Sequence, residues 1–151
     1  MLIGIPKEIL PAEKRVAATP DTVRKYIALG FEVGVETNAG RGILIGDDDY
    51  QDVGAKIYFN AESLYADADI VLKVKQPIYD EKMEEHEVKM LRKDSILITF
   101  LHPAAPENHD MVKQLQAKNI TAFTMDGIPR IPRAQRMDAL SSMSAVTGYQ
   151  S

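Results

Sequence analysis

The run Ala68-Asp69-Ile70-Val71-Leu72-Lys73-Val74-Lys75, residues 68–75, decides the fold class of this 151-residue chain. It is almost continuously apolar, and Pro77 marks its end. Such a run is typical of a central strand that is buried on both faces of a parallel sheet. Lys73 and Lys75 alternate with Val74, so both point to the same side if the strand extends that far. We interpret one of the two lysines as a solvated strand end.

Similar short apolar runs lie on both sides of this strand, and segments with helical signals separate them. The sequence predicts strands at residues 2–5, 31–36, 55–59, 95–100 and 120–125. It predicts helices from Thr19 to Gly30, at residues 47–53, 61–66 and 79–92, and from Pro106 to Asn119. This alternation favours an α/β fold, with a doubly wound, mainly parallel sheet and helices on both faces, Rossmann-like or flavodoxin-like. We expect a single domain over residues 1–151.

Polar residues mark the ends and the exposed faces of these helices. Thr19 is expected to cap the first helix, with Pro20 in its first turn, and Asp47 to cap the second. The segment 79–92 is highly charged, so we interpret it as a solvated helix that carries His86 on the surface.

Three glycines in the pattern Gly40-x-Gly42-x-x-x-Gly46 raise the question of a dinucleotide-binding loop. The spacing is one residue too long, and aspartates occupy positions 47–49, where a pyrophosphate requires positive potential. We therefore reject a nucleotide site here and interpret the segment as a flexible turn. The expected fold lacks the glycine-rich dinucleotide fingerprint.

The composition excludes several classes of function. The formal net charge is -4 and no long basic run occurs, which argues against binding of nucleic acid. The chain has no cysteine, which excludes a disulfide scaffold and thiol chemistry. The start of the chain is broken by Pro6 and Lys7, unlike a signal peptide, and no apolar run approaches the ~18 residues of a membrane span. We expect a soluble, cytoplasmic protein without direct membrane insertion and without a metal site.

Polar residues follow several of the predicted strands. Arg15 follows the first strand after a long polar loop, Lys75 ends the central strand, and His102 follows the strand at 95–100. The carboxyl ends of parallel strands lie along one edge of a sheet, so we expect these three side chains to converge there. A guanidinium, an ammonium and an imidazole together suit a 2-oxo acid.

The segment after the last strand, residues 125–150, presents a second polar set. Pro129 and Pro132 stiffen its beginning and disfavour a helix before Arg133. A helical pattern starts at about Met137, and Asp138, Ser141 and Ser142 share one face of it. The set that faces a ligand is Arg130, Gln135, Asp138 and Ser141. It suits the orientation of an amide or a ribose, and it contains no obvious nucleophile.

The order of residues in this segment is specific. The run R-x-x-R-A-Q-x-x-D-A-L-S-S-M, residues 130–143, resembles the nicotinamide loop of the NAD(H)-binding (alpha) component of proton-translocating NAD(P) transhydrogenases. Four further motifs resemble the N-terminal domain that these proteins share with alanine dehydrogenases: GIPKE, KRVAATP, LKVKQP and TFLHP. Together the matches span essentially the whole chain.

The transhydrogenase resemblance implies that Arg130, Gln135, Asp138 and Ser141 hold the nicotinamide of NAD(H) and its ribose. Hydride then passes directly to or from NADP(H) on a partner domain, coupled to proton translocation. The resemblance also implies a homodimer, a membrane-embedded subunit and an NADP(H)-binding subunit as partners. The protein would then lie in the cytoplasm, peripheral to the inner membrane.

The alanine dehydrogenase resemblance implies a different chemistry, the reductive amination of pyruvate. Arg15 and Lys75 then bind the substrate, and His102 exchanges a proton with it. His102 is a feature of the dehydrogenase branch, so the chain carries signs of both families, although the longer loop match favours a transhydrogenase. A stand-alone, non-catalytic binding module is the third alternative. Both families require a second domain with the true NAD fingerprint, so we expect residues 1–151 to belong to a longer chain and to be inactive alone.

Overall fold

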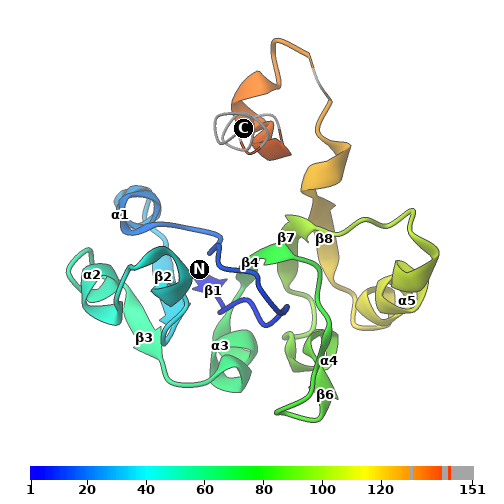
Figure 1. Cartoon of the computed structure of the whole chain (residues 1–151), viewed down its shortest axis with the longest axis horizontal. Coiled ribbons are helices and arrows are strands. Elements are labelled where there is room, and N and C mark those ends of the chain that lie inside the picture. The colour runs from blue at the N-terminus through cyan, green and yellow to red at the C-terminus, as the bar shows by residue number, and fades with distance from the viewer. Residues whose placement is uncertain (130, 141–142, 144–151) are drawn as a thin grey trace.

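The computed structural model describes residues 1–129, 131–140 and 143, and its centre is a parallel sheet (Figure 1). The sheet has six strands in the order β3-β2-β1-β4-β7-β8, and all neighbouring strands run parallel. The strands are β1 Leu2–Ile5, β2 Glu32–Glu36, β3 Lys56–Tyr58, β4 Ile70–Lys75, β7 Ile96–Phe100 and β8 Thr121–Thr124. Strand order grows outward from β1 and β4 in opposite directions, which confirms the predicted doubly wound sheet.

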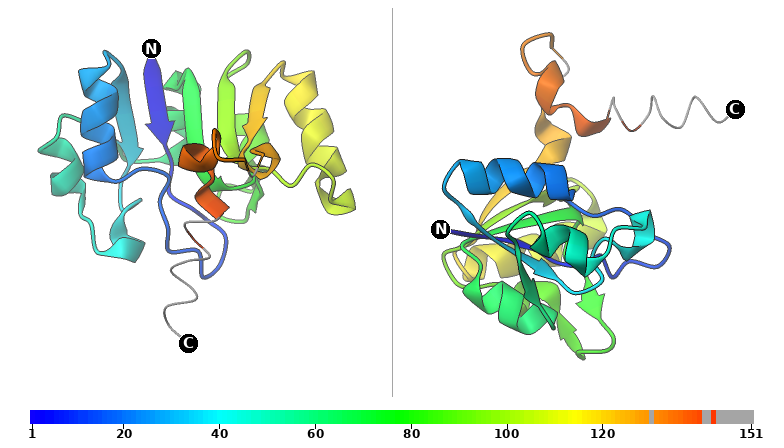
Figure 2. Two further views of the ribbon diagram at one scale, coloured as in Figure 1. Left: turned by 90° about the horizontal axis from the view of Figure 1, so that it is seen from above. Right: turned by 90° about the vertical axis from the view of Figure 1, so that its left-hand side faces the viewer.

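Helices cover both faces of the sheet (Figure 2). On one face, α1 Pro20–Ala28 and α2 Asp47–Gln51 bury apolar side chains against β1 and β2. On the other face lie α3 Ala61–Asp67, α4 Glu87–Met90 and α5 His109–Ala117. Helix α3 packs against β1 and β2, and the buried side chains of α4 and α5 join a cluster with Val71 of β4 and Leu97 of β7. This two-sided burial explains why the strands are apolar without strict alternation.

The close approach of α3 to the sheet depends on Gly4 in β1. A β-carbon at this position would lie 2.8 Å from the β-carbon of Ala68 and 3.3 Å from a methyl carbon of Leu64. The neighbouring residues of the strand, Ile3 and Ile5, are buried in the cluster below α1. Gly4 therefore sets the spacing between the sheet and α3.

Two predicted helix caps differ from the structure. Thr19 occupies the N-cap position of α1, but its side chain makes no capping hydrogen bond to the helix. Its hydroxyl lies instead 3.3 Å from that of Thr22. The cap of α2 is Gly46 rather than Asp47, and the Gly46 N–H donates to the carboxylate of Asp49 at 2.7 Å.

Asp47 is the first residue of α2, and the loop after β2 engages its carboxylate. The Thr37 hydroxyl donates to it at 2.6 Å and the Asn38 N–H at 2.8 Å. These long-range donors explain why Asp47 does not cap its own helix.

The prediction of one solvated helix over residues 79–92 is wrong. This segment is an antiparallel hairpin of β5 Tyr79–Asp80 and β6 Glu85–His86, followed by the short helix α4. The Asp80 carboxylate accepts the N–H groups of Lys82 and Met83 and so favours a turn over a helix.

His86 is not the surface residue that the sequence predicts. It is partly buried, and burial lowers its pKa. Its Nδ1 accepts the N–H of Val88 at 3.3 Å, so the imidazole caps α4. The helix α4 is buried rather than solvated, with Glu87, Val88 and Met90 inside the domain.

After β8 the chain forms a 3₁₀ turn at Met125–Gly127 and another at Gln135–Met137. Residues 131–134 are not helical, as the prolines predict, and helical backbone starts at Ala139, about two residues later than predicted. We refer to residues 125–138 as the 125–138 loop. Arg130, Ser141 and Ser142 lie outside the described residues. Within the described part of the chain, no helix combines the length and apolar character needed to cross a membrane.

Candidate functional site

The ends of three neighbouring strands bring the predicted site residues to the carboxyl edge of the sheet. Lys75, the last residue of β4, is paired in register with Phe100, the last residue of β7. His102 follows two residues later, and Thr99 in β7 is paired with Thr124 at the end of β8. The prediction that the strand exits meet at one edge is thus confirmed for β4, β7 and β8. Among the described residues, no hydrogen bond or ion pair joins Arg15, Lys75 and His102 to one another.

A buried ionic network lies beneath this edge. The Lys73 ammonium lies 2.7 Å from a carboxylate oxygen of Glu87 and 3.5 Å from one of Glu8. The Tyr65 hydroxyl donates to the same Glu87 oxygen at 2.6 Å. The other Glu87 oxygen accepts the N–H of Ile78 at 2.9 Å, which ties the hairpin to the sheet. We call Glu8, Lys73, Glu87 and Tyr65 the buried network.

Burial shifts the pKa values of this network. It raises the pKa of Glu8, although Lys73 and the Val74 N–H act in the opposite direction. Burial alone disfavours the Lys73 ammonium, but Glu87 and Glu8 outweigh this effect, and the pKa of Lys73 is raised. The network therefore keeps a charged lysine inside the domain by pairing it with two carboxylates.

Glu8 also completes the hydrogen bonding of β4. The pairing of β4 with β7 shifts register between Leu72 and Lys75, the mark of a bulge. The Glu8 carboxylate accepts the N–H groups of Val74 at 2.7 Å and Lys75 at 3.3 Å. Glu8 thus fixes the end of β4 to the loop of residues 6–19, which we call the edge loop.

Arg15, at the far end of the edge loop, grips a carboxylate of its own chain. Its Nε donates to Glu13 at 2.8 Å, its Nη2 at 2.5 Å and its backbone N–H at 2.9 Å. These hydrogen bonds lower the pKa of Glu13 to about 2, and the charge of Lys75 contributes in the same direction. Arg15 makes direct hydrogen bonds to Glu13, whereas Lys75 contributes only a weaker electrostatic effect. The Arg15 Nη1 also lies 2.7 Å from the sulfur of Met143.

Glu13→Gln is expected to lower the free energy of unfolding near neutral pH. The folded-state pKa of about 2 lies below the ordinary value of 4.5, so the carboxylate stabilises the fold above pH 4.5. This stabilisation is lost as the pH falls toward 2, so the difference between wild type and variant should shrink below pH 4.5. Urea unfolding at about pH 7 and about pH 3.5 measures the two differences. Glu107→Gln, at an exposed position, is the control; a difference for Glu13→Gln that stays constant with pH contradicts the expectation.

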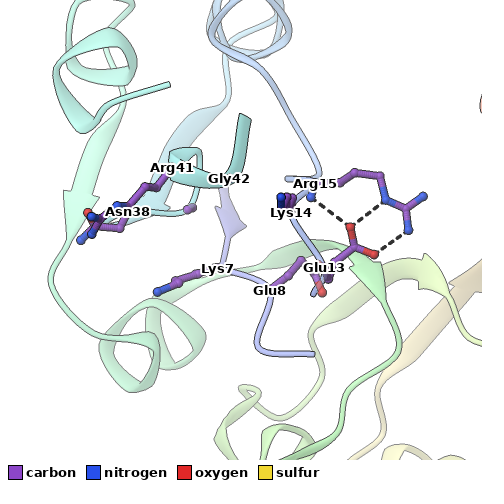
Figure 3. A pocket seen from close by; sticks show the side chains of 9 residues that line it. Lys7, Glu8, Glu13, Lys14, Arg15, Asn38, Arg41 and Gly42 are labelled. Carbon is purple, nitrogen blue, oxygen red and sulfur yellow. Dashed lines mark hydrogen bonds and ion pairs between the residues drawn. The ribbon is translucent and has the colours of Figure 1, made fainter. Parts of the chain in front are cut away.

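A cavity of about 230 Å³ opens between the edge loop and the turn after β2 (Figure 3). It is lined by Lys7, Glu8, Glu13, Lys14, Arg15, Asn38, Ala39, Arg41 and Gly42. A β-carbon on Gly42 would lie 2.3 Å from the carbonyl oxygen of Lys14, so this glycine is required by close packing. Gly40 is also closely packed, since a β-carbon there would lie 2.9 Å from the carbonyl oxygen of Ile45, so two of the three glycines of the rejected motif have a packing reason. Figure 3 shows the Arg15 guanidinium directed toward Glu13, away from Lys7 and Arg41.

His102 is held by Asp126, which the sequence places at the same edge, after the last strand, without assigning it a role in the site. The His102 Nδ1 lies 2.9 Å from one Asp126 oxygen, and the His102 N–H donates to the other at 2.8 Å. Burial raises the pKa of Asp126, but hydrogen bonds from Thr124 and His102 outweigh it, and the pKa is lowered. The signal in the sequence was the position of Asp126 just after the last strand, beside the strand that precedes His102.

The described members of the second polar set lie on the 125–138 loop. Gln135 is exposed and begins the 3₁₀ turn, whereas Asp138 is partly buried and follows it. Ala134, the residue before this turn, is buried at 5% exposure. Arg130 and Ser141, the other two predicted members, lie outside the described residues. Over the part of the chain that the structure describes, no three His, Asp or Glu side chains are grouped to hold a metal ion.

Comparisons with known proteins agree with this architecture. The family model described as "Alanine dehydrogenase/PNT, N-terminal domain" matches residues 4–147. NAD(P) transhydrogenase subunit alpha of Haemophilus influenzae is 41% identical over 99% of the chain, which covers 27% of that relative. An alanine dehydrogenase of Methanococcus maripaludis is 35% identical over 100% of the chain, which covers 38% of that enzyme.

A solved structure is similar as well. The transhydrogenase from Sinorhizobium meliloti superposes with a TM-score of 0.88 at 35% identity, over 99% of this chain and 42% of that one. The chain thus spans less than half the length of each of these relatives.

Proposed function

The chain belongs to the alanine dehydrogenase/PNT N-terminal domain family, and from this premise we propose that it forms one portion of the NAD(H)-binding component of an NAD(P) transhydrogenase. One observation carries the proposal: Gln135 and Asp138 lie at a short 3₁₀ turn in a loop that leaves the carboxyl edge of the sheet after β8. In open α/β sheets, ligands bind outside this edge. The identity to a transhydrogenase alpha subunit, 41% against 35% for an alanine dehydrogenase, supports the same choice.

The chemistry of the donor set fits a nicotinamide ring and its ribose. An amide such as Gln135 both donates to and accepts from a carboxamide, and a carboxylate such as Asp138 accepts from ribose hydroxyls. Arg130 and Ser141 complete the proposed set. Bound NAD(H) supplies the hydride that is exchanged with NADP(H) on a partner domain. The residues of this chain bind and orient the ring, and none of them needs to transfer a proton.

The partners and the location follow from the same proposal. The protein acts as a homodimer together with a membrane-embedded subunit and an NADP(H)-binding subunit, whose proton translocation is coupled to the transfer. It is cytoplasmic and peripheral to the inner membrane through these subunits. Residues 1–151 form a single domain of a longer protein, the glycine-rich NAD fingerprint lies in another domain, and residues 1–151 alone are inactive.

A second candidate function is the substrate domain of an alanine dehydrogenase. The pairing of the His102 imidazole with the Asp126 carboxylate favours it. In that reaction Arg15 and Lys75 bind the 2-oxo acid, and His102 exchanges a proton with it. A non-catalytic binding module is the third candidate.

A hydride-transfer assay on the full-length protein separates the three candidates. NADH is offered with an acetylpyridine analogue of NADP⁺ and the NADP(H)-binding partner, and separately with pyruvate and ammonia. Transfer between nucleotides without pyruvate is the expected result. Oxidation of NADH that depends on pyruvate and ammonia establishes the alanine dehydrogenase candidate instead. Activity in neither assay leaves the binding module as the function.

A further inference from the structure

The backbone of His102 adopts a left-handed conformation that residues other than glycine rarely take. Its φ is +46°, although the residue is a histidine at the exit of β7. Such a conformation costs free energy and persists only where the surroundings impose it. The contacts that hold His102 in this conformation therefore indicate which interactions stabilise the exit of β7.

Two neighbouring elements fix the main chain of His102. The Asp126 carboxylate accepts its N–H at 2.8 Å, from the 3₁₀ turn that starts the 125–138 loop. The Asn108 amide donates to the His102 carbonyl oxygen at 3.0 Å and to that of Leu101 at 3.2 Å, from the 3₁₀ turn Pro106–Asn108 that precedes α5. Asn108 is buried, so this second contact is protected from water.

The imidazole of His102 is held by the same carboxylate. Its Nδ1 lies 2.9 Å from the Asp126 oxygen that does not accept the backbone N–H. The ring also stacks on Phe100, with 6.4 Å between centroids and 20° between planes. Both oxygens of Asp126 thus engage one residue, which fixes the orientation of the carboxylate as well as that of the ring.

Asp126 is in turn tied to β8. The Thr124 hydroxyl donates to it at 2.5 Å and accepts the N–H of Leu101 at 3.2 Å. The exits of β7 and β8 are therefore joined at the point where the 125–138 loop begins. Pro129 and Pro132 follow in the sequence of this loop, and each fixes its own φ, which reduces the conformational freedom between Asp126 and Gln135.

We propose that Asp126 is the positioning residue of the 125–138 loop and that His102 serves as its anchor rather than as a proton-transfer group. This inference rests on the proposed transhydrogenase function, since it gives the loop the task of orienting the nicotinamide ring. Asp126 does not touch the nucleotide. It sets where the loop leaves the sheet, and thereby where Gln135 and Asp138 lie.

The test compares Asp126→Asn, His102→Gln and the double variant in the full-length protein with its NADP(H)-binding partner. Asp126→Asn keeps the size of the side chain but removes its negative charge and so weakens its interactions with the N–H and the imidazole of His102. The hydride-transfer kcat should fall about tenfold, because a small misplacement of reacting groups is costly, while KM for NADH stays nearly unchanged. The double variant should be no slower than the slower single variant, because the two residues act as one unit. Asp126→Glu should recover some of the rate.

Asp110→Asn, at an exposed carboxylate on α5 that pairs with Lys113, is the matched control and should leave kcat unchanged. A wild-type kcat for Asp126→Asn overturns the inference. A double variant whose loss of kcat equals the product of the two single losses also overturns it. The same holds if the loss of kcat disappears once the rate is divided by the folded fraction, measured by circular dichroism. A wild-type protein that transfers no hydride between nucleotides refutes the proposed function instead, which keeps the two failures distinct.

Discussion

Replacing Lys73 with methionine is expected to lower the free energy of unfolding by about 3–5 kcal/mol. Lys73 is 5% exposed and neutralises Glu8 and Glu87, which are 7% and 2% exposed. Without the ammonium, two buried carboxylates face each other with no cation between them. Unfolding of the full-length protein in urea, followed by circular dichroism, measures the loss.

Lys75→Met is the matched control, since Lys75 lies two residues further along β4 and is only partly buried. Lys75→Met should lower the free energy of unfolding by less than about 1 kcal/mol, the range typical of exposed ion pairs. Adding Glu87→Gln to Lys73→Met should restore some of the stability, because it removes one of the uncompensated charges. Equal losses for Lys73→Met and Lys75→Met would show that the buried network does not stabilise the domain.

Gln135→Ala is expected to lower the rate of hydride transfer between nucleotides about a hundredfold. Its amide is proposed to fix the rotation of the nicotinamide carboxamide, and alanine offers no donor or acceptor in its place. Affinity for NADH should change much less, since the remaining contacts to the nucleotide are intact. Single-turnover stopped-flow with the acetylpyridine analogue measures the transfer step itself.

Gln116→Ala makes the same substitution at an exposed position on α5, remote from the 125–138 loop in sequence. It should transfer hydride at the wild-type rate. A Gln135→Ala protein as fast as this control would remove Gln135 from the proposed set. A Gln135→Ala protein in which only the rate of the pyruvate-dependent reaction falls would instead support the alanine dehydrogenase candidate.

The strands could be predicted because each is a short apolar run with a clear end. All six lie within one or two residues of the predicted ranges, from β1 at Leu2–Ile5 to β8 at Thr121–Thr124. The parallel arrangement then followed from the alternation with helices. The edge at which Lys75 and His102 leave the sheet could be predicted for the same reason.

The buried network and the hairpin could not be predicted from local patterns. Glu87 looks like one of many charges in a solvated segment, yet it is buried because Lys73 and Tyr65 meet it from other elements. Only the presence of Lys73 within an apolar strand hinted at a buried partner, and it did not say which carboxylate. The position of Asp126 after the last strand indicated the edge at which it lies, but its contact with His102 joins two strand exits and could not be predicted from a local pattern.

The place of β1 inside the sheet has a consequence for the synthesis of the protein. β1 pairs with β2 on one side, Leu2 opposite Glu32, and with β4 on the other, Ile3 opposite Ile70. During translation the first pair can form early, but the second edge of β1 stays open until β4 has left the ribosome. An open strand edge is a template for pairing with other chains. A nascent chain from which β4 has not yet emerged therefore exposes this edge of β1, and during that stage of synthesis the edge is open to pairing with other chains.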